Sequence, residues 1–158
     1  MTVHDQVLKS MQQMQESFAA TGVNLELPPA SSRTLGPSYT AFDYGKVIEG
    51  EIRFDNRFTN PLQMYQGGIL VGALDEFFGP LSFMAAERPA LTIEMSTTYL
   101  RPFTAKDETI VIRAEVVAKT KSLIVMKAEV KTKSGKLVAI ASNHSMITNA
   151  DHLSGRKN

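Results

Sequence analysis

The chain has 158 residues, a length that suits a single domain with a buried core, and its composition of 43% hydrophobic and 21% charged residues is ordinary for a globular protein. Its 17 basic and 16 acidic side chains leave a formal net charge of +1, which gives no support for a nucleic-acid-binding surface. There is no cysteine, so disulfides, cysteine-ligated zinc and thiol nucleophiles are excluded. The three histidines, His4, His144 and His152, lack a metal-binding spacing, so we expect no metal site. The chain does not open with a basic segment followed by an apolar core, so we expect a cytoplasmic protein without a secretory signal.

The N-terminal part of the chain combines a predicted helix with a predicted loop. Residues 3–20 place apolar side chains three or four positions apart, which is typical of an amphipathic helix. These apolar positions are Val3, Val7, Met11, Met14 and Phe18. Gly22 is expected to end the helix. Residues 24–38 contain three prolines, three serines and a glycine, so we expect a loop or arm across the surface.

A half-buried strand is predicted over residues 46–54, where polar and apolar side chains alternate. The residues expected to face the core are Ile48, Gly50, Ile52 and Phe54. The stretch at residues 60–86 follows; it opens with a polar turn, passes through a pair of glycines and then runs almost wholly apolar. Its length and its Leu, Ala, Phe and Met content favour a helix that is buried on nearly every side. Pro80 cannot donate a hydrogen bond to the carbonyl of Glu76, so we expect a kink or a restart of the helix there.

Two adjacent acids, Asp75 and Glu76, lie inside this apolar stretch. Burying an ionised carboxylate without a partner is costly or shifts its pKa, so their presence needs an explanation. One simple explanation is that Glu76 lies on a narrow exposed stripe of the helix. A membrane span is another alternative, because the stretch approaches the ~20 residues that a span requires. Two central acids would oppose insertion, and alternating strands flank the stretch, so we expect no membrane span.

Four further strands are predicted after the helix, at residues 91–100, 107–119, 122–133 and 136–148. In the first strand, one face is expected to carry Leu91, Ile93, Met95 and Tyr99, and the other Thr92, Glu94, Ser96 and Thr98. In the next two strands, the inward residues are expected to be Ile110, Ile112, Ala114, Val116 and Ala118, and then Ile124, Met126, Ala128 and Val130. Turns at residues 120–121 and 134–135 would join the last three strands. The layout predicts an α+β fold in which an antiparallel meander wraps around one long central helix.

At this point the sequence resembles the hotdog-fold thioesterases, in particular the small acyl-CoA thioesterases of the phenylacetate-pathway and 4-hydroxybenzoyl-CoA type. The family pattern is an Asn in the turn before the helix, then His-Gly-Gly, then an acid nine residues after that His. The matching positions here are Asn60, Gln66, Gly67, Gly68 and Asp75. The run TIEMSTTYLRP at residues 92–102 also resembles the strand after the helix in this family. The chain departs from the pattern at Gln66, which can donate a hydrogen bond but cannot titrate.

The resemblance implies a hotdog domain over residues 38–150, preceded by a helix and arm at residues 1–37 and followed by a polar tail at residues 151–158. It implies hydrolysis of an acyl-CoA or related thioester, with Asp75 as general base or nucleophile. The Gly67 amide, at the start of a helix, is the expected oxyanion donor. Gln66 would help to place the thioester carbonyl, and Asn60 and Thr92 would hold the water or the thioester. Each residue also has an ordinary structural explanation, such as a turn for Asn60 or strand preference for Thr92.

We further expect CoA to be part of the substrate, with no separate cofactor. The basic residues that would bind its phosphates are Arg101, Lys119 and Lys121. Phe77, Phe78, Phe83 and Met84 could line an aryl or an aliphatic acyl pocket. The family resemblance also implies a homodimer, or a tetramer of dimers, because an open sheet edge requires a partner. An alternative is a hotdog protein that binds an acyl-CoA or lipid without catalysis; a hotdog dehydratase is disfavoured because no histidine lies between His4 and His144.

Overall fold

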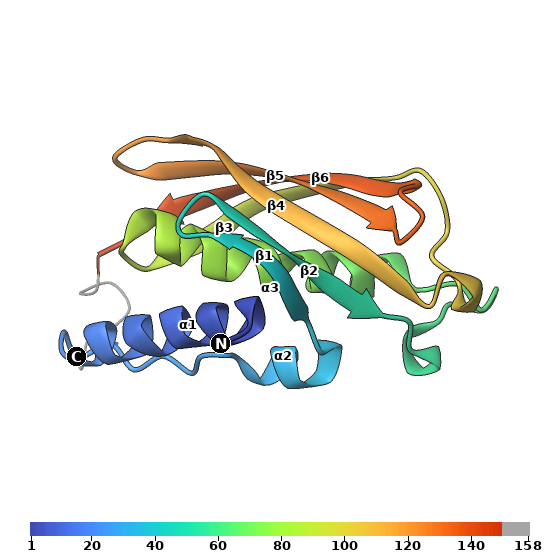
Figure 1. Cartoon of the computed structure of the whole chain (residues 1–158). Helices are drawn as coiled ribbons and strands as arrows, with labels where there is room; N and C mark the ends of the chain where they lie inside the picture. Colours follow the sequence, from blue (N-terminus) through green and yellow to red (C-terminus); the bar gives the residue numbers. More distant parts are fainter. Residues whose placement is uncertain (150–158) are drawn as a thin grey trace.

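In the computed structural model of the chain, which describes residues 1–149, a six-stranded antiparallel sheet wraps around one long helix (Figure 1). The strands lie in the order β1-β2-β4-β5-β6-β3. The helices are α1 (Val3–Ala19), α2 (Ala30–Leu35) and α3 (Gly67–Ala86), and the strands are β1 (Ser38–Asp43), β2 (Val47–Arg53), β3 (Ala90–Tyr99), β4 (Thr109–Lys119), β5 (Leu123–Thr132) and β6 (Leu137–Ile147). The predicted α+β fold with a central and an N-terminal helix is confirmed, whereas the predicted tail at 151–158 lies outside the described residues.

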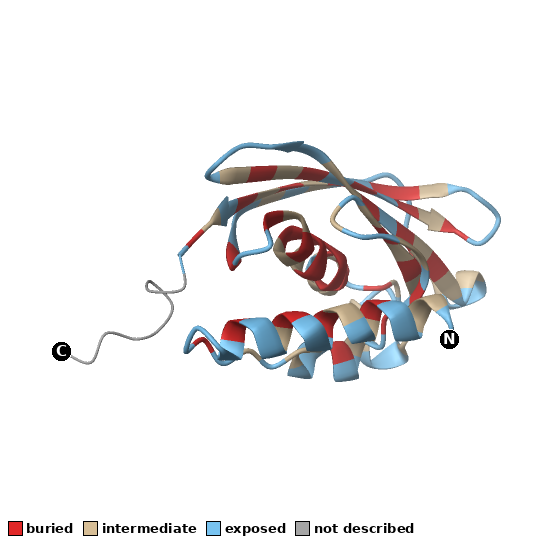
Figure 2. Cartoon of the chain, turned by 60° about the vertical axis from the view of Figure 1, so that its left-hand side comes forward, coloured by how far each residue is buried: buried red, intermediate tan, exposed pale blue. Residues whose placement is uncertain are grey.

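The N-terminal helix forms a third layer, on the side of α3 that faces away from the sheet (Figures 1 and 2). A capping box between Thr2 and Asp5 starts α1. Its buried face is the predicted apolar stripe, with Val3 only partly buried. Near its C-terminal end the ring of Phe18 meets the ring of Phe83 on α3 edge-on at 5.9 Å. This layer covers an apolar face of the central helix that the sheet cannot reach.

The predicted arm at residues 24–38 was only partly correct, because it contains the short helix α2 and leads directly into β1, which the sequence analysis missed. Pro29 precedes α2 and Gly36 ends it with a φ of 62°, a left-handed conformation that favours glycine. Six residues are too few to establish a helical period. In β1 a register shift between Tyr39 and Ala41 breaks the alternation that would have marked a strand.

Strand β2 confirms the predicted alternation and brings the sheet close to α3. Ile48 and Ile52 are fully buried, and Gly50 lies between them on the same face. A side chain at Gly50 would come within 2.6 Å of the Ser38 carbonyl and 2.9 Å of the Phe77 ring. The absence of a side chain at this position therefore lets β1 and α3 pack against β2.

The central helix runs without interruption through Pro80, so the predicted restart is wrong. Proline removes the donor for the Glu76 carbonyl, and the Tyr39 hydroxyl donates to that carbonyl at 3.4 Å instead. One turn further on, the Ser82 hydroxyl donates to the carbonyl of Gly79 at 2.7 Å. By length and composition α3 is apolar enough to cross a membrane, but it forms the buried core helix between the sheet and α1 (Figure 2).

The sheet is not the simple meander that was predicted. Strands β4, β5 and β6 do follow one another, but β3 pairs with β6 at the far edge, and β4 pairs with β2. The connection from β3 to β4 therefore crosses from one side of the sheet to the other. As a result β3 is an edge strand, paired on one side only, and most of its residues are exposed in the single chain.

Two β-bulges change which residues face the helix. A register shift between Thr92 and Glu94 in β3 turns Thr92 toward α3, where its hydroxyl lies 3.4 Å from Asp75. The predicted faces of β3 are thus wrong for Thr92, because a bulge reverses the alternation. A second shift, between Val116 and Ala118 in β4, leaves the predicted core residue Ala118 exposed.

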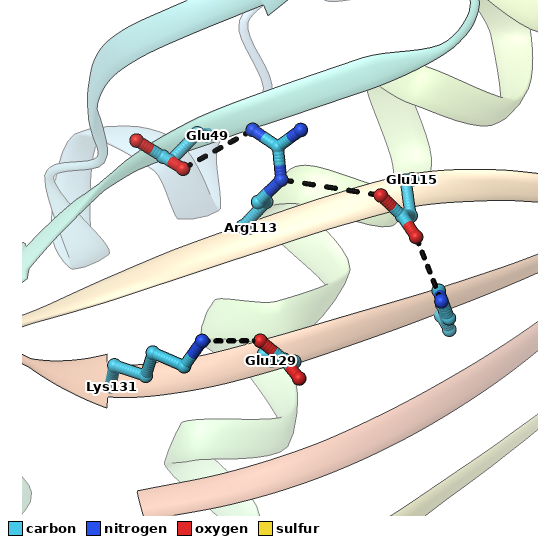
Figure 3. Close-up of polar contacts among 6 residues, drawn as sticks. Glu49, Arg113, Glu115, Glu129 and Lys131 are labelled. Atoms are coloured by element: carbon cyan, nitrogen blue, oxygen red, sulfur yellow. Dashed lines mark hydrogen bonds and ion pairs between the residues drawn. The ribbon is translucent and has the colours of Figure 1, made fainter. Parts of the chain in front are cut away.

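The sheet face that points away from α3 carries a row of paired charges (Figure 3). Arg113 on β4 lies between Glu49, at 3.3 Å, and Glu115, at 4.0 Å, and Glu115 contacts Lys127 at 2.9 Å. The pairs Glu49–Arg113 and Glu115–Lys127 join neighbouring strands, and such partly exposed pairs stabilise a sheet modestly. The charges satisfy one another in contact with water, so this region of the outer face carries no unpaired charge that would indicate a ligand.

Candidate active site

The two acids of α3 have opposite surroundings. Glu76 is 6% exposed and accepts a hydrogen bond from the Ser32 hydroxyl on α2. Asp75 is exposed in the single chain and points toward Thr92 on the edge strand. The suggestion that Glu76 lies on an exposed stripe is therefore wrong. Asp75 is the acid that a ligand can reach, and Glu76 has a structural partner.

Asp75 stands at the end of a chain of polar side chains that leads into the sheet. The Thr92 hydroxyl lies 3.4 Å from Asp75 Oδ1, and the Asn143 side-chain amide donates to that hydroxyl at 3.2 Å. The Ser145 hydroxyl in turn donates to Asn143 Oδ1 at 2.7 Å. Asn143 and Ser145, on β6, are 0% and 1% exposed. Sequence reasoning missed both, although polar residues in an otherwise apolar strand were a signal that could have drawn attention to them.

The surroundings of Asp75 raise the pKa of its carboxyl above the usual value. Loss of hydration is the main cause, because atoms of α3 and β3 surround the carboxyl although water still reaches it. The neighbouring charge of Glu76 raises the pKa further, and the hydrogen bond from Thr92 lowers it. A carboxylate with a raised pKa is a stronger base than an ordinary aspartate.

The N-terminal end of α3 provides free hydrogen-bond donors. Gln66 is the N-cap residue, and its exposed side chain makes no capping bond. Among the residues described, the backbone N–H groups of Gly67 and Gly68 have no protein acceptor. The Tyr99 hydroxyl donates to the Gly67 carbonyl at 2.7 Å, and a side chain at position 67 would meet Tyr99 at 3.0 Å. The glycine thus leaves room for Tyr99 beside a pair of free amides.

Asn60 shapes the turn that leads to these amides. Its side-chain oxygen accepts hydrogen bonds from the backbone of Leu62, at 2.9 Å, and of Met64, at 3.1 Å. This is the structural explanation given for Asn60 above. Its side chain also lines an open hollow of about 470 Å³, together with Gly67, Tyr99 and Arg101. A larger hollow, of about 660 Å³, lies between α1 and Pro28, away from every predicted site residue.

The predicted residues form two separate groups in one chain. We call Asn60, Gln66 and Gly67 the amide half-site, and Asp75 and Thr92 the carboxylate half-site. Asp75 follows Gly67 by eight positions of continuous helix, which at a rise of 1.5 Å per residue is about 12 Å. One thioester carbon cannot touch both half-sites of the same chain. Gln66 is the N-cap residue just before the helix, and this position does not by itself bring it to Asp75.

The predicted CoA-binding residues are not brought together either. Arg101 lies beside the amide half-site, where its Nε donates to the Leu137 carbonyl at 2.9 Å. Lys119 lies at the opposite end of α3 and donates to the Ala85 carbonyl at 2.6 Å, an interaction that suits the negative end of a helix dipole. Lys121 follows in the β4–β5 turn. In one chain these three residues do not form a single phosphate site.

The predicted acyl-pocket residues fill the core instead. Phe77 and Phe78 are fully buried, and Met84 is 1% exposed. Phe77 packs edge-on against Tyr39 at 5.6 Å, and Phe83 packs against α1. These side chains stabilise the layers on both sides of α3 and do not line an open pocket in the single chain.

The fold and the helix-to-strand segment define a hotdog protein, and the comparisons with known proteins agree. Residues 66–139 match the model of the thioesterase superfamily, and this match confirms the expected resemblance. The matched segment includes Gln66, Gly67, Asp75 and Thr92, and it indicates thioester hydrolysis as the class of reaction. No curated protein matches the sequence at a significant level.

Solved structures give the same fold at low identity. The chain is 19% identical to the E. coli PaaI protein of the phenylacetic acid degradation operon, with a TM-score of 0.72 over 90% of this chain and 96% of that one. It is 26% identical to a phenylacetic acid degradation-related protein of Ralstonia eutropha JMP134, with a TM-score of 0.68 over 82% and 98% of the two chains. A Streptococcus mutans UA159 protein bound to acetyl-CoA is 19% identical, with a TM-score of 0.65 over 72% and 89%.

Proposed function

We propose that this protein hydrolyses an acyl-CoA, or a related acyl thioester, to the free acid and the thiol. The observation that carries the proposal is the Asp75–Thr92 pair, an accessible carboxylate with a raised pKa inside the segment that matches the thioesterase superfamily. The acetyl-CoA bound to the Streptococcus mutans protein makes a CoA ester a reasonable substrate class.

The chemistry follows from the two half-sites. Asp75 takes a proton from water as the water attacks the thioester carbonyl, or it attacks that carbonyl itself and the resulting anhydride is hydrolysed. The backbone N–H of Gly67 donates to the oxyanion that forms, supported by the positive end of the α3 dipole. Gln66 adds a side-chain donor to the same oxygen. The thiolate of CoA leaves, and no cofactor is required.

Because the half-sites of one chain are about 12 Å apart along α3, we propose that each active site combines two chains. The amide half-site of one copy would face the carboxylate half-site of another across the exposed edge of β3. The exposed apolar side chains here include Ile93 on β3, at 58% exposed, and Leu100 just after it, at 51%. A second copy that pairs along β3 would cover them and exclude water from the reacting groups.

Arg101 is the basic residue that we assign to the CoA phosphates, since it lines the same hollow as Gly67. Lys119 and Lys121 remain candidates only if the second copy brings the far end of α3 near this hollow. The acyl group would then enter between the two chains rather than into the packed core around Phe77.

The decisive experiment measures CoA release from a panel of aryl and aliphatic acyl-CoAs with a thiol reagent. We expect turnover by the wild-type protein and only a small residual rate from Asp75→Asn. Binding of acyl-CoA without release would favour the alternative, a non-catalytic acyl-CoA-binding protein, for which the replacement of the family His by Gln66 is the motivating observation.

A complementation experiment tests whether the sites are shared. Asp75→Asn and Gln66→Ala chains, differently tagged and co-expressed, would form mixed dimers in which one site keeps both intact half-sites. With random pairing about a quarter of all sites should then be intact. Activity of the mixture that stays at the mean of the two separate variants would mean that each chain carries its own complete site.

A further inference from the structure

Asn143 is buried in the sheet beside the carboxylate half-site, and the mechanism above does not use it. Its side chain is 0% exposed and lies on β6, opposite Met95 and Met126 in the neighbouring strands. An amide side chain so fully removed from water must find its hydrogen bonds within the protein. Asn143 finds two, to Thr92 and to Ser145.

The donor and acceptor roles in this chain of side chains have one consistent direction. An amide nitrogen donates and cannot accept, so the bond from Asn143 Nδ2 occupies a lone pair of the Thr92 hydroxyl. The single proton of that hydroxyl is then available for Asp75 Oδ1, at 3.4 Å. An ionised carboxylate only accepts hydrogen bonds, so it requires a donor at this point.

The opposite orientation of the Asn143 amide would break this arrangement. Its oxygen would face Thr92 and attract the hydroxyl proton, and Asp75 would lose its donor. In the orientation that the structure has, the Ser145 hydroxyl donates to Asn143 Oδ1 at 2.7 Å, so both polar atoms of the buried amide have partners. The hydrogen bonds therefore run from Ser145 through Asn143 and Thr92 to Asp75.

We propose that Asn143 is a positioning residue of this site, which directs the Thr92 proton toward Asp75 and so keeps the carboxylate ionised and correctly oriented. The inference rests on the proposed hydrolysis at Asp75 and extends it to a residue that touches neither substrate nor reacting atoms. It also explains why a buried polar pair is kept in β6, where apolar residues would pack at no cost in desolvation.

Other charged groups near Asp75 do not replace this effect. Within residues 1–149, the charged group that acts on Asp75 is Glu76, which faces the core and Ser32. On β3 and β6, Glu94 and His144 pair with each other at 2.9 Å on the sheet face that points away from α3. The hydrogen bond from Thr92 is thus the contribution that favours the ionised form of Asp75.

The test replaces Asn143 by Leu, which has a similar volume and makes no hydrogen bond, and follows the ionisation of Asp75 in two ways. In ¹³C NMR, with Asp75→Asn for assignment, the Asp75 carboxyl should titrate at higher pH in Asn143→Leu than in the wild type, because the Thr92 hydroxyl is no longer held by Asn143 and can turn its proton away from Asp75. In steady-state kinetics, the acid limb of the pH profile of kcat/KM should also move to higher pH. We expect kcat to fall about 3- to 10-fold, the size of one hydrogen bond, with KM nearly unchanged.

Controls separate this role from a general loss of packing. Ser142→Ala, one residue earlier on the opposite sheet face, should leave both titrations unchanged. In a Thr92→Val background, Asn143→Leu should no longer change the titration of Asp75, because the hydroxyl that connects the two side chains is already absent. Should Asn143→Leu fail to fold, Asn143→Ser, whose side chain is too short to reach Thr92, should give the same upward shift.

The NMR titration also separates a failure of the proposed function from a failure of the positioning role of Asn143. If no thioester is hydrolysed but the Asp75 titration moves as expected, the proposed function fails and the positioning role stands. An Asp75 titration that is the same in wild type and in the folded Asn143 variant overturns the positioning role, whatever the activity. The positioning role is also overturned if the Asn143 variant has a lower melting temperature and a lower kcat but an unchanged acid limb in its pH profile of kcat/KM. A purely structural residue would give that result.

Discussion

Neighbouring residues of one helix can take opposite roles, and Asp75 and Glu76 are an example. On a helix they point about 100° apart, so one carboxylate faces the edge strand and the other faces α2. Glu76 has a buried donor in Ser32, whereas Asp75 has a longer bond to Thr92 and stays accessible. Because of these different surroundings, we expect substitutions of Asp75 and of Glu76 to have different effects.

Asp75→Asn should lower thioesterase turnover about 100- to 10,000-fold, the range for a lost general base, while Glu76→Gln should keep most of the activity. Asp75→Asn should also raise the melting temperature at neutral pH. The raised pKa of Asp75 in the folded state means that its ionisation opposes folding. This opposition begins as pH rises through the ordinary aspartate pKa of about 3.9 and is complete above the folded-state pKa.

The stabilisation by Asp75→Asn should therefore disappear near pH 3, where the carboxyl is protonated in both states. Melting curves at several pH values and steady-state kinetics test both parts. An active Asp75→Asn enzyme would show that the wrong carboxylate has been assigned. So would an inactive Glu76→Gln enzyme of unchanged stability.

Gln66 is the residue at which this chain departs from the family pattern. Its exposed side chain at the N-cap of α3 makes no capping bond, so it is free to donate to a substrate. Gln66→Ala should reduce turnover about 10- to 1000-fold, around the range for loss of one oxyanion donor, and Gln66→His should retain activity. Steady-state kinetics on both variants decide this, and a Gln66→Ala enzyme with the parent rate would place the residue outside the site.

At the scale of single residues, sequence spacing selected candidate residues more sharply than burial could. The spacing selected Gln66 and Asp75, which lie within the segment that matches the superfamily, and Asn60, which precedes it, but it could not locate Asn143. Asn143 lies 51 residues from Thr92 in sequence and meets it only across the sheet. The sequence also could not predict which of Asp75 and Glu76 is buried, because this depends on how α2 packs against α3.

At the scale of elements, α2 is held against α3 by one buried polar contact. The Ser32 hydroxyl donates to Glu76, and both side chains are less than 10% exposed, at 8% and 6%. The same short helix carries Arg33, whose ion pair with Glu26 at 2.8 Å is exposed to water. Adjacent positions of one helix therefore provide a buried and an exposed interaction to compare.

Ser32→Ala should lower the free energy of unfolding by about 1–3 kcal/mol, because it leaves the Glu76 carboxylate buried without this donor. Arg33→Ala should change it by about 0.5 kcal/mol or less, since surface ion pairs contribute little. Urea unfolding measures both. Equal costs for the two variants would mean that the Ser32–Glu76 contact does not hold α2 in place.

Long, regular elements were predictable and irregular ones were not. The α1 stripe, the β2 alternation and the inward residues of β5 follow from simple periods, and the structure confirms them. The period fails at the bulges of β3 and β4, where one extra residue reverses the alternation. It also fails at α2, where Pro29 and Gly36 were available as boundary signals but were assigned to a loop.

At the scale of the molecule, the exposed edge of β3 predicts a homodimer at micromolar concentration. Ile93→Glu should convert the dimer to a monomer, measured by light scattering, and should abolish activity with it, because the shared site is lost. Val117→Glu is the matched control: Val117 is 57% exposed on β4, away from the edge, so dimer and activity should persist. A wild-type protein that is a stable monomer at this concentration would contradict the prediction.

The position of β3 beside β6 has a consequence for how the chain is made. A ribosome completes β3 before β4 and β5, but the neighbour of β3 in the sheet is β6, the last strand of the described chain to be translated. Until β6 leaves the exit tunnel, β3 has no strand to pair with, and Thr92 and Asp75 lack the support of Asn143. A nonsense codon between Thr92 and Leu137 would therefore remove Asn143 from behind the carboxylate half-site while leaving both Asp75 and Thr92 in the translated product.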